Sequence, residues 1–254
     1  MDPLDWRNLC LLSMNHAYEG VLPLKVLRAS GPYLASQQGR HLQNLRCIVV
    51  FGGGGAVIVG FLLHPILGLL FALVLARAAF RQYARATRYR KGILGEKLVS
   101  TVLAGLSDDF YLINDVTLPG HRGNIDHVLV GPCGVVTIET KHYRGVIRCD
   151  RDQWFVDGRR IKSISRQVTL GAMAVKDCLN DRSLAFRTSR VRWVEGVVVF
   201  TNPLCRLDIN RPGPTIVRFS ELLTLIAEKA KQRALDAVQS SLIAGALARR
   251  AGEG

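Results

Sequence analysis

The amino-acid sequence predicts a mixed α/β domain, preceded by an apolar helical segment able to anchor it in a membrane. Two observations carry this prediction. Residues 47–76 contain no formally charged side chain. Beyond residue 91, short runs of alternating apolar residues are separated by Gly and Pro, and runs of apolar residues at helical spacing lie between them. With 254 residues, the chain has room for one ordinary domain and an appendage.

The composition is strongly basic and shows no cysteine framework. The chain has 34 Lys and Arg against 20 Asp and Glu, a formal net charge of +14. Such an excess favours a polyanionic partner, either nucleic acid or an anionic membrane surface. The six cysteines form no Cys-x-x-Cys pair, so we expect no zinc site of the usual spacing, and scattered reduced thiols fit a cytoplasmic compartment. We expect no cleavable leader, because the first residues include acids and the apolar run begins late.

The N-terminal third is predicted to be helical and membrane-associated. Residues 1–46 form a juxtamembrane helical segment, interrupted by prolines, in which residues 6–17 are weakly amphipathic. As one helix, residues 47–76 would measure about 45 Å, against about 30 Å of hydrocarbon. Pro65 permits a bend near the middle, and basic residues flank both ends, so we favour a transmembrane or re-entrant hairpin that returns to the cytoplasm. A single crossing and a buried helix pair in a soluble core remain alternatives. Residues 77–91 form a basic helical connector.

The remaining residues are predicted to form the α/β domain at 92–205 and a C-terminal helical extension at 206–254. Apolar residues at helical spacing predict helices at 95–106, 163–181, 221–233 and onward to about residue 250. Alternating or continuous apolar runs predict strands at 110–118, 124–130, 135–141, 145–156 and 196–200.

The chemistry is concentrated in a predicted β-hairpin. Residues 124–130 and 135–141 flank Gly131-Pro132-Cys133-Gly134, which is typical of a four-residue hairpin loop. If Val130 pairs with Val135, the register places Asp126 opposite Glu139. Because side chains alternate between faces, Lys141 shares the face of both acids. His127 and His142 then point to the opposite face and are expected to be structural.

Two acids facing each other on neighbouring strands are destabilising unless a positive charge lies between them. Lys141 can offset one charge, and a hard divalent cation such as Mg²⁺ would balance the pair more completely. The alternative is a partly exposed salt-bridge cluster. The apolar residues on both faces of these strands argue against that alternative, because buried charges are costly unless they are paired or bound to metal.

The stretch from about residue 92 to 200 resembles the nuclease-related (NERD) domain, a branch of the PD-(D/E)xK nuclease superfamily. Four motifs occur in the family's order: the helix motif Gly-Ile-Leu-Gly-Glu-Lys-Leu-Val with Glu96, the Ile-Asp-His-Val hairpin with Asp126, the Ile-Glu-Thr-Lys motif with Glu139 and Lys141, and Gln167 on the following helix. Ile125 stands where the superfamily's namesake has proline. The resemblance covers under half of the chain.

The resemblance implies a three-layer α/β/α, restriction-endonuclease-like fold with a mixed central sheet. It also implies phosphodiester hydrolysis that depends on Mg²⁺ or Mn²⁺. The implied metal ligands are Asp126, Glu139, the backbone carbonyl of Thr140 and Glu96; for Glu96, a solvated acid in a first helical turn is the alternative. The implied catalytic set is Glu96, Asp126, Glu139, Lys141 and Gln167.

Basic residues around these motifs are expected to hold a nucleic-acid backbone without reading its sequence. The expected contacts are Arg122, Arg144, Arg148 and Arg166. The leading hypothesis is a membrane-anchored nuclease, with DNA as the expected substrate and the domain facing the cytoplasm. Its rivals are a catalytically silent nucleic-acid-binding module tethered to the membrane, and a protein-interaction scaffold.

Overall fold

The computed structural model describes residues 25–28, 32–62, 64–181 and 191–251. The predicted amphipathic piece at 6–17 lies outside these residues. The chain divides into two compact units, one made of residues Gly31–Lys97 and the other of Met1–Ser30 and Leu98–Gly254.

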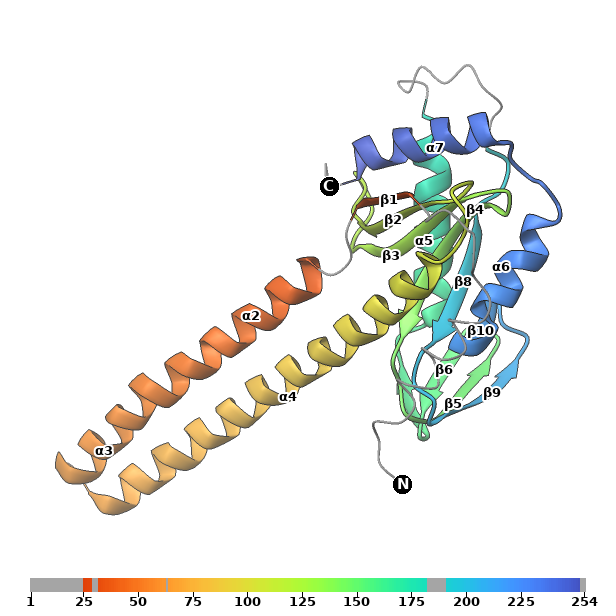
Figure 1. Cartoon of the computed structure of the whole chain (residues 1–254). Helices are drawn as coiled ribbons and strands as arrows, with labels where there is room; N and C mark the ends of the chain where they lie inside the picture. The colour runs from red at the N-terminus through yellow and green to blue at the C-terminus, as the bar shows by residue number, and fades with distance from the viewer. Residues whose placement is uncertain (1–24, 29–31, 63, 182–190, 252–254) are drawn as a thin grey trace. The chain divides into compact units, whose positions relative to one another are not determined.

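The unit Gly31–Lys97 is a helical hairpin. Helix α2 (Pro32–Cys47) continues through a π-helical turn, Ile48–Gly52, into α3 (Gly53–Leu62), and α4 (Pro65–Leu103) runs back alongside them (Figure 1). The bend falls at His64-Pro65, as predicted, since the proline ring cannot continue the preceding helix. The predicted connector at 77–91 is part of α4, whose last residues, Leu98–Leu103, belong to the α/β unit.

The two arms of the hairpin approach each other closely at glycines. A Cβ atom added to Gly68 would lie 2.5 Å from the Cα of Gly60, so only glycine fits there. Nearer the base, the His41 ring stacks on Tyr89 with 5.4 Å between centroids, and its Nδ1 lies 2.7 Å from Oε1 of Gln82. The arms therefore pack along their length.

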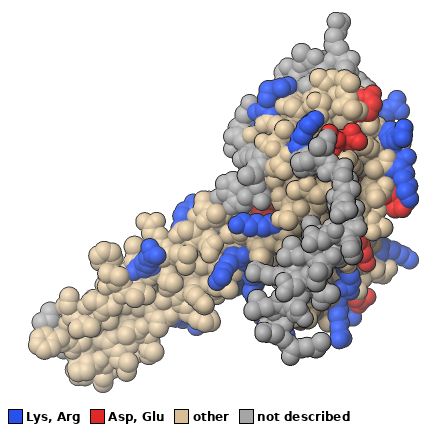
Figure 2. Space-filling view, viewed as in Figure 1, with Lys and Arg blue, Asp and Glu red and all other residues tan. Residues whose placement is uncertain are grey.

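The outer surface of the hairpin tip is apolar. Large side chains there stand exposed, among them Phe51, Val57, Phe61, Leu69 and Val74. Figure 2 shows this end free of blue and red charged atoms among the residues drawn in colour. By length and composition, α4 is the one described helix able to cross a membrane.

The α/β unit is built on a six-stranded mixed sheet with the order β1-β2-β3-β4-β8-β10. Its strands are β1 (Lys25–Arg28), β2 (Tyr111–Val116), β3 (Ile125–Gly131), β4 (Gly134–Lys141), β8 (Glu195–Phe200) and β10 (Thr215–Arg218). β2, β3 and β4 are antiparallel neighbours, whereas β1 pairs with β2, and β8 with both β4 and β10, in parallel.

Helices cover both faces of this sheet, which completes the predicted three layers. On one face, α5 (Ile164–Leu179) and α7 (Ala237–Arg250) pack on valines and isoleucines of β2, β3 and β4. On the other face, the end of α4 and α6 (Leu222–Ala230) pack through Val99, Leu103, Leu222 and Ile226. The fold class agrees with the nuclease-related architecture that the resemblance implied.

A second sheet of four strands has the order β7-β6-β5-β9. It contains β5 (Gly145–Asp150), β6 (Gln153–Val156), β7 (Arg159–Ile161) and β9 (Cys205–Asn210). Its inner face packs on α5 and β8 through a cluster centred on Trp154 and Phe200, whose rings lie 6.2 Å apart.

Several sequence predictions need correction here. The single strand predicted at 145–156 is the hairpin of β5 and β6, because Arg151 takes a positive φ of 54° at the turn. The segment predicted as a helical extension, 206–254, begins with strands β9 and β10 before its helices. Lys25–Arg28 form a strand inside the segment predicted as helical at 1–46. The hairpin loop after Val130 is a two-residue turn, because Gly131 pairs with Gly134.

Candidate active site

The predicted hairpin register is confirmed as far as the structure pairs it. Val130 pairs with Val135, and the pairing continues outward to His127 with Ile138. Val128 and Val130 pack toward α5 and α7, so the alternating side chains of this face point to the same helices. The last paired position lies one residue short of Asp126 and Glu139, so the predicted direct pairing of these two acids is not part of the ladder.

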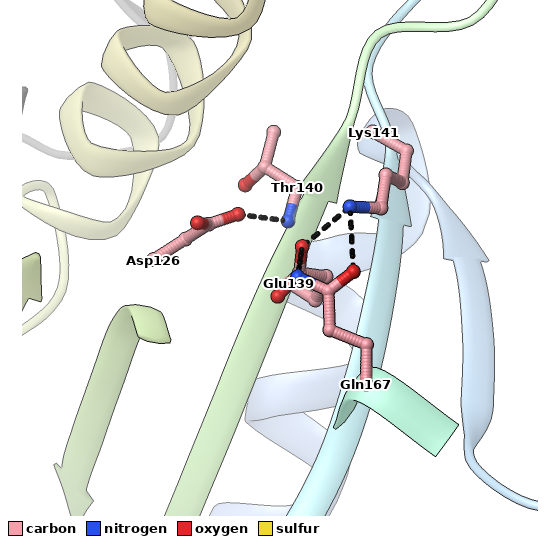
Figure 3. A network of polar contacts seen from close by, with 5 residues as sticks. All are labelled: Asp126, Glu139, Thr140, Lys141 and Gln167. Carbon is pink, nitrogen blue, oxygen red and sulfur yellow. Dashed lines mark hydrogen bonds and ion pairs between the residues drawn. The ribbon is translucent and has the colours of Figure 1, made fainter. Parts of the chain in front are cut away.

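Three side chains meet at the end of β4 and the start of α5 (Figure 3). Lys141 Nζ donates to Oε1 of Glu139 at 2.5 Å and to Oε1 of Gln167 at 3.2 Å. Gln167 Nε2 donates to the same Oε1 of Glu139 at 2.7 Å. Period-two spacing puts Glu139 and Lys141 on one face of β4, and Gln167 reaches them from the first turn of α5, which Ser163 caps by accepting from the backbone N–H of Arg166.

Asp126 is held beside this cluster by the backbone. Its Oδ2 accepts from the N–H of Thr140 at 2.7 Å, and Figure 3 shows its carboxylate directed at β4 between Glu139 and Lys141. The ladder between β3 and β4 ends at His127, so this hydrogen bond is what holds Asp126 against β4, the strand that carries Glu139 and Lys141. The structure therefore brings together four of the five predicted catalytic residues: Asp126, Glu139, Lys141 and Gln167.

The two acids dominate the electrostatics of the cluster. Asp126 and Glu139 are 8% and 6% exposed. Burial alone would lower the pKa of Lys141, but the negative charges of Glu139 and Asp126 outweigh it and raise that pKa above its ordinary value. Lys141 is therefore an ammonium ion at neutral pH, and it balances one of the two carboxylates.

The donor set fits a hard divalent cation. Both contacts made to Glu139 fall on Oε1, and Oε2 has no hydrogen-bond partner among the described residues. Two buried carboxylates against one ammonium leave one negative charge, and carboxylate and carbonyl oxygens are ligands that Mg²⁺ accepts. Within the described residues, however, no group of three or more His, Cys, Asp or Glu side chains is arranged to hold a metal. A cation here would rely on the two acids, a backbone carbonyl and water.

Glu96 lies on α4 in the helical unit, with its side chain only 6% exposed. The alternative of a solvated acid in a first helical turn is wrong on both counts, since the residue is buried and lies far from the start of the 39-residue α4 at Pro65. Its part in metal binding stays a prediction.

The histidines next to the motifs have structural contacts. His127 Nδ1 lies 2.7 Å from Oδ1 of Asn114, and complete burial lowers the pKa of His127 to about 3. His142 Nδ1 lies 2.9 Å from Oγ1 of Thr201. Both of these contacts are with polar groups outside the cluster of Asp126, Glu139 and Lys141, which agrees with a structural role for the two rings.

Sequence reasoning missed a buried polar chain behind the hairpin. Asn114 Nδ2 donates to Oγ of Ser100 at 3.3 Å, so Ser100 on α4, Asn114 on β2 and His127 on β3 are linked in series. The signal was the polar pair Asn114-Asp115 inside the otherwise apolar strand predicted at 110–118. Asp115, at a positive φ of 55°, accepts from Nδ2 of Asn124 at 2.6 Å and so ties β2 to the start of β3, next to Asp126.

The four arginines expected to contact nucleic acid are all exposed and lie on different elements. Arg122 is in the loop before β3, Arg144 follows β4, and Arg166 is in the first turn of α5. Arg148 on β5 donates through Nε to Oδ2 of Asp208 at 2.9 Å. Their nucleic-acid contacts stay a prediction.

Comparison with known proteins supports the resemblance over one part of the chain. The family model described as "Nuclease-related domain" matches residues 91–201. An uncharacterized protein of Bacillus anthracis is 39% identical over 61 residues, a stretch that covers 22% of this chain and 29% of that protein. The chain thus matches less than a third of this relative's length. No solved structure matches the chain significantly.

Proposed function

Because residues 91–201 of this chain are a nuclease-related domain of the PD-(D/E)xK superfamily, we propose that the protein is a membrane-anchored, Mg²⁺-dependent nuclease. It hydrolyses phosphodiester bonds in nucleic acid, with DNA as the expected substrate and internal bonds as the expected target. The observation that carries the proposal is the cluster at one end of β4, where Glu139, Lys141 and Gln167 contact one another and Asp126 accepts from the backbone N–H of Thr140.

In this proposal Asp126, Glu139 and the backbone carbonyl of Thr140 would hold the metal, and Glu96 would join them directly or through water. When bound, the cation lowers the pKa of an attacking water and reduces the negative charge on the scissile phosphate. Mn²⁺ accepts the same oxygen ligands and serves in its place.

The side chains around it have separate tasks. Lys141 stays protonated between its partners, so it is ready to orient the attacking water or to stabilise the charge that develops on the phosphate. Gln167 holds both Glu139 and Lys141, and it therefore fixes the distance between acid and ammonium before substrate arrives. The backbone bond from Thr140 does the same for Asp126. Such preorganisation is where enzymes gain most of their rate.

The helical hairpin supports membrane attachment of the domain. Exposed apolar side chains along its tip form a surface of the kind that marks a membrane or protein contact. The uncharged part of each arm, residues 47–62 and 65–76, would measure about 24 Å and about 18 Å, short of the roughly 30 Å hydrocarbon core. We therefore favour a re-entrant hairpin. Arg46 on one side, and the basic residues of 77–91 on the other, favour a cytoplasmic domain.

Cleavage by the full-length chain in neutral detergent tests the activity. Supercoiled and linear DNA are incubated with Mg²⁺, with Mn²⁺ or with a chelator, and the products are separated on gels. We expect metal-dependent cleavage that falls about 100-fold or more in Asp126→Asn and Lys141→Ala. Glu228→Gln and Lys231→Ala are matched controls, because this exposed ion pair at the end of α6 loses the same charges on the sheet face opposite α5, outside the cluster of Asp126, Glu139 and Lys141. All four variants must keep the circular dichroism spectrum of the parent.

The outcomes separate the hypotheses. Undiminished cleavage in Asp126→Asn and Lys141→Ala would refute the assignment of the site. Salt-sensitive DNA binding with no cleavage under any metal, unaffected by Glu139→Gln, would favour the silent binding module. Absence of any DNA affinity at low salt would favour the interaction scaffold.

Membrane attachment is tested by fractionation. The full chain should remain with membranes through high salt and alkaline carbonate, and deletion of residues 47–76 should release it. Release of the intact chain by salt alone would show that the basic surface, not the hairpin, holds it there.

A further inference from the structure

The second sheet has one face built for the core and one for solvent. Across its four strands, Ile161 pairs with Trp154, Trp154 with Cys149, and Cys149 with Ile209. All of these side chains belong to the cluster that packs on α5 and β8. The inner row is therefore apolar from edge to edge.

The adjacent row, which alternation places on the opposite face, has a different composition. Arg160 pairs with Phe155, Phe155 with Arg148, and Arg148 with Asp208. Arg148 is 65% exposed and Asp208 59%, Arg160 is exposed, and Phe155 is partly exposed. An aromatic ring thus lies between two arginines on an outward sheet face, in a row about 14 Å long.

The surroundings of this row are basic. Residues 144–162 and 204–213 contain eight Lys and Arg against four Asp. Outside the row, the basic residues are Arg144, Arg151, Arg159, Lys162, Arg206 and Arg211, and all of them are exposed. Where Figure 1 draws β5 and β9, Figure 2 shows blue side chains with a few red ones among them. The face therefore complements a polyanion.

The sheet also adjoins the candidate active site. β5 starts four residues after Lys141, and β7 ends six residues before Gln167. The strands β5 to β7 are therefore inserted in the chain between Lys141 and Gln167, whose side chains contact each other. Ile164, in the same turn of α5 as Gln167, and Phe200, which pairs with Lys141, both belong to the cluster under the sheet. The second sheet is therefore anchored on the same elements that carry Lys141 and Gln167.

We propose that the outer face of this sheet binds single-stranded nucleic acid, with a base stacked on Phe155 and phosphates held by Arg148 and Arg160. The assignment rests on the proposed nuclease function and narrows its substrate. In a duplex the base faces are covered by their neighbours, whereas an unpaired base offers its π-face to an aromatic ring. A partly exposed ring between two arginines on an outward sheet face therefore fits an unpaired strand better than an undistorted duplex.

Removal of the Asp208 carboxylate should change the binding affinity in the opposite direction to removal of an arginine. Its exposed ion pair with Arg148 contributes little to stability, but it competes with a phosphate for the same guanidinium. Removing this carboxylate frees Arg148 and lowers the local negative charge. Binding should become tighter, while removal of an arginine weakens it.

The test measures binding without cleavage. The full chain in neutral detergent, with a chelator present, is titrated into fluorescein-labelled single-stranded DNA of about 12 nucleotides and into a duplex of equal length. We expect tighter binding of the single strand. Phe155→Leu, which keeps an apolar side chain but removes the ring, should weaken single-strand binding about fivefold or more and leave duplex binding unchanged. Arg160→Gln should reduce the slope of log affinity against log salt by about 0.7, Asp208→Asn should tighten binding, and Arg249→Gln on α7 is the control of equal charge.

Equal affinities for single strand and duplex, or no change in Phe155→Leu, would overturn the proposal. So would the result that Arg160→Gln weakens binding to vesicles with about 30% anionic lipid but not binding to the oligonucleotide. Because no metal is present, these outcomes are independent of catalysis. A chain that binds as expected but never cleaves contradicts the nuclease proposal alone.

Discussion

A single methyl group at Gly196 should disturb both the fold and the site. Gly196 lies on β8 under α5, and a Cβ atom there would stand 2.3 Å from Cγ1 of Val168. Carbon atoms in contact prefer about 3.5–4.0 Å, so something must move by more than about 1 Å. Val168 is buried and its χ1 is restricted in a helix, which leaves α5 itself to shift. The residue before Val168 on α5 is Gln167, whose side-chain amide binds Glu139 and Lys141.

Gly196→Ala should therefore destabilise the domain by about 1–3 kcal/mol, the usual cost of overpacking. For a unit of this size that lowers Tm by about 2–12 °C. Thermal unfolding of the full chain, followed by circular dichroism in detergent, measures it. Metal-dependent DNA cleavage at a temperature where the variant is folded should also fall, because the displaced helix carries Gln167 away from Glu139.

A substitution at Val168 tests whether Gly196→Ala destabilises the domain by crowding that side chain. Val168→Ala removes the γ-carbons and makes a cavity that is destabilising on its own. In the double variant the new methyl group fills that cavity, so the two changes should couple favourably by about 1 kcal/mol or more. Gly213→Ala is the control, since nothing lies within 4 Å of a Cβ there. Equal melting of Gly196→Ala and Gly213→Ala, or additive effects in the double variant, would refute the packing argument.

Three further changes test other parts of the structure. Gly68→Leu should push the hairpin arms toward the roughly 8–10 Å separation of ordinary helix pairs, because its Cβ would meet the backbone of Gly60. Distances between spin labels on the two arms should therefore increase. Gly54→Leu is the control and should leave these distances unchanged, since nothing lies within 4 Å of a Cβ atom there. Burial raises the pKa of the Cys133 thiol from its ordinary 9.0 to about 12, so above about pH 9 the folded state keeps a proton that the unfolded state loses. The free energy of unfolding measured in urea should therefore fall as pH rises above about 9. Cys133→Ala should reduce this dependence of stability on pH. Asp236→Ala should cost about 1 kcal/mol in urea unfolding, because its Oδ1 caps α7 by accepting from a backbone N–H at 2.7 Å; an unchanged midpoint would show that α7 is held by packing alone.

The central hairpin was predictable because its information is local. The Gly131–Gly134 turn and the alternation of valines set the register, and period two alone puts Glu139 and Lys141 together. The position of Asp126 was less accessible, since the ladder ends before it and its partner is a backbone N–H that carries no sequence signature.

Other features depend on partners far away in the sequence. β1 looks like part of a helical stretch until Tyr111 is available to pair with Lys25. β9 joins β5 across some 60 residues, so nothing near 205–210 announces a strand. The break between β5 and β6 depends on a left-handed conformation at Arg151, a residue type that rarely signals one. Tertiary pairing decided these elements, not local propensity.

The pairing of β1 with β2 restricts how the chain can thread a bilayer. β1 precedes the apolar hairpin in sequence, β2 follows it, and the two strands share hydrogen bonds in one sheet. A segment that crossed an odd number of times would leave its two flanks in different aqueous compartments, where no ladder could join them. If residues 47–76 insert into a bilayer, they must therefore enter and leave it on the same side. Strand β1 can also pair with β2 only after the whole hairpin between them has been synthesised.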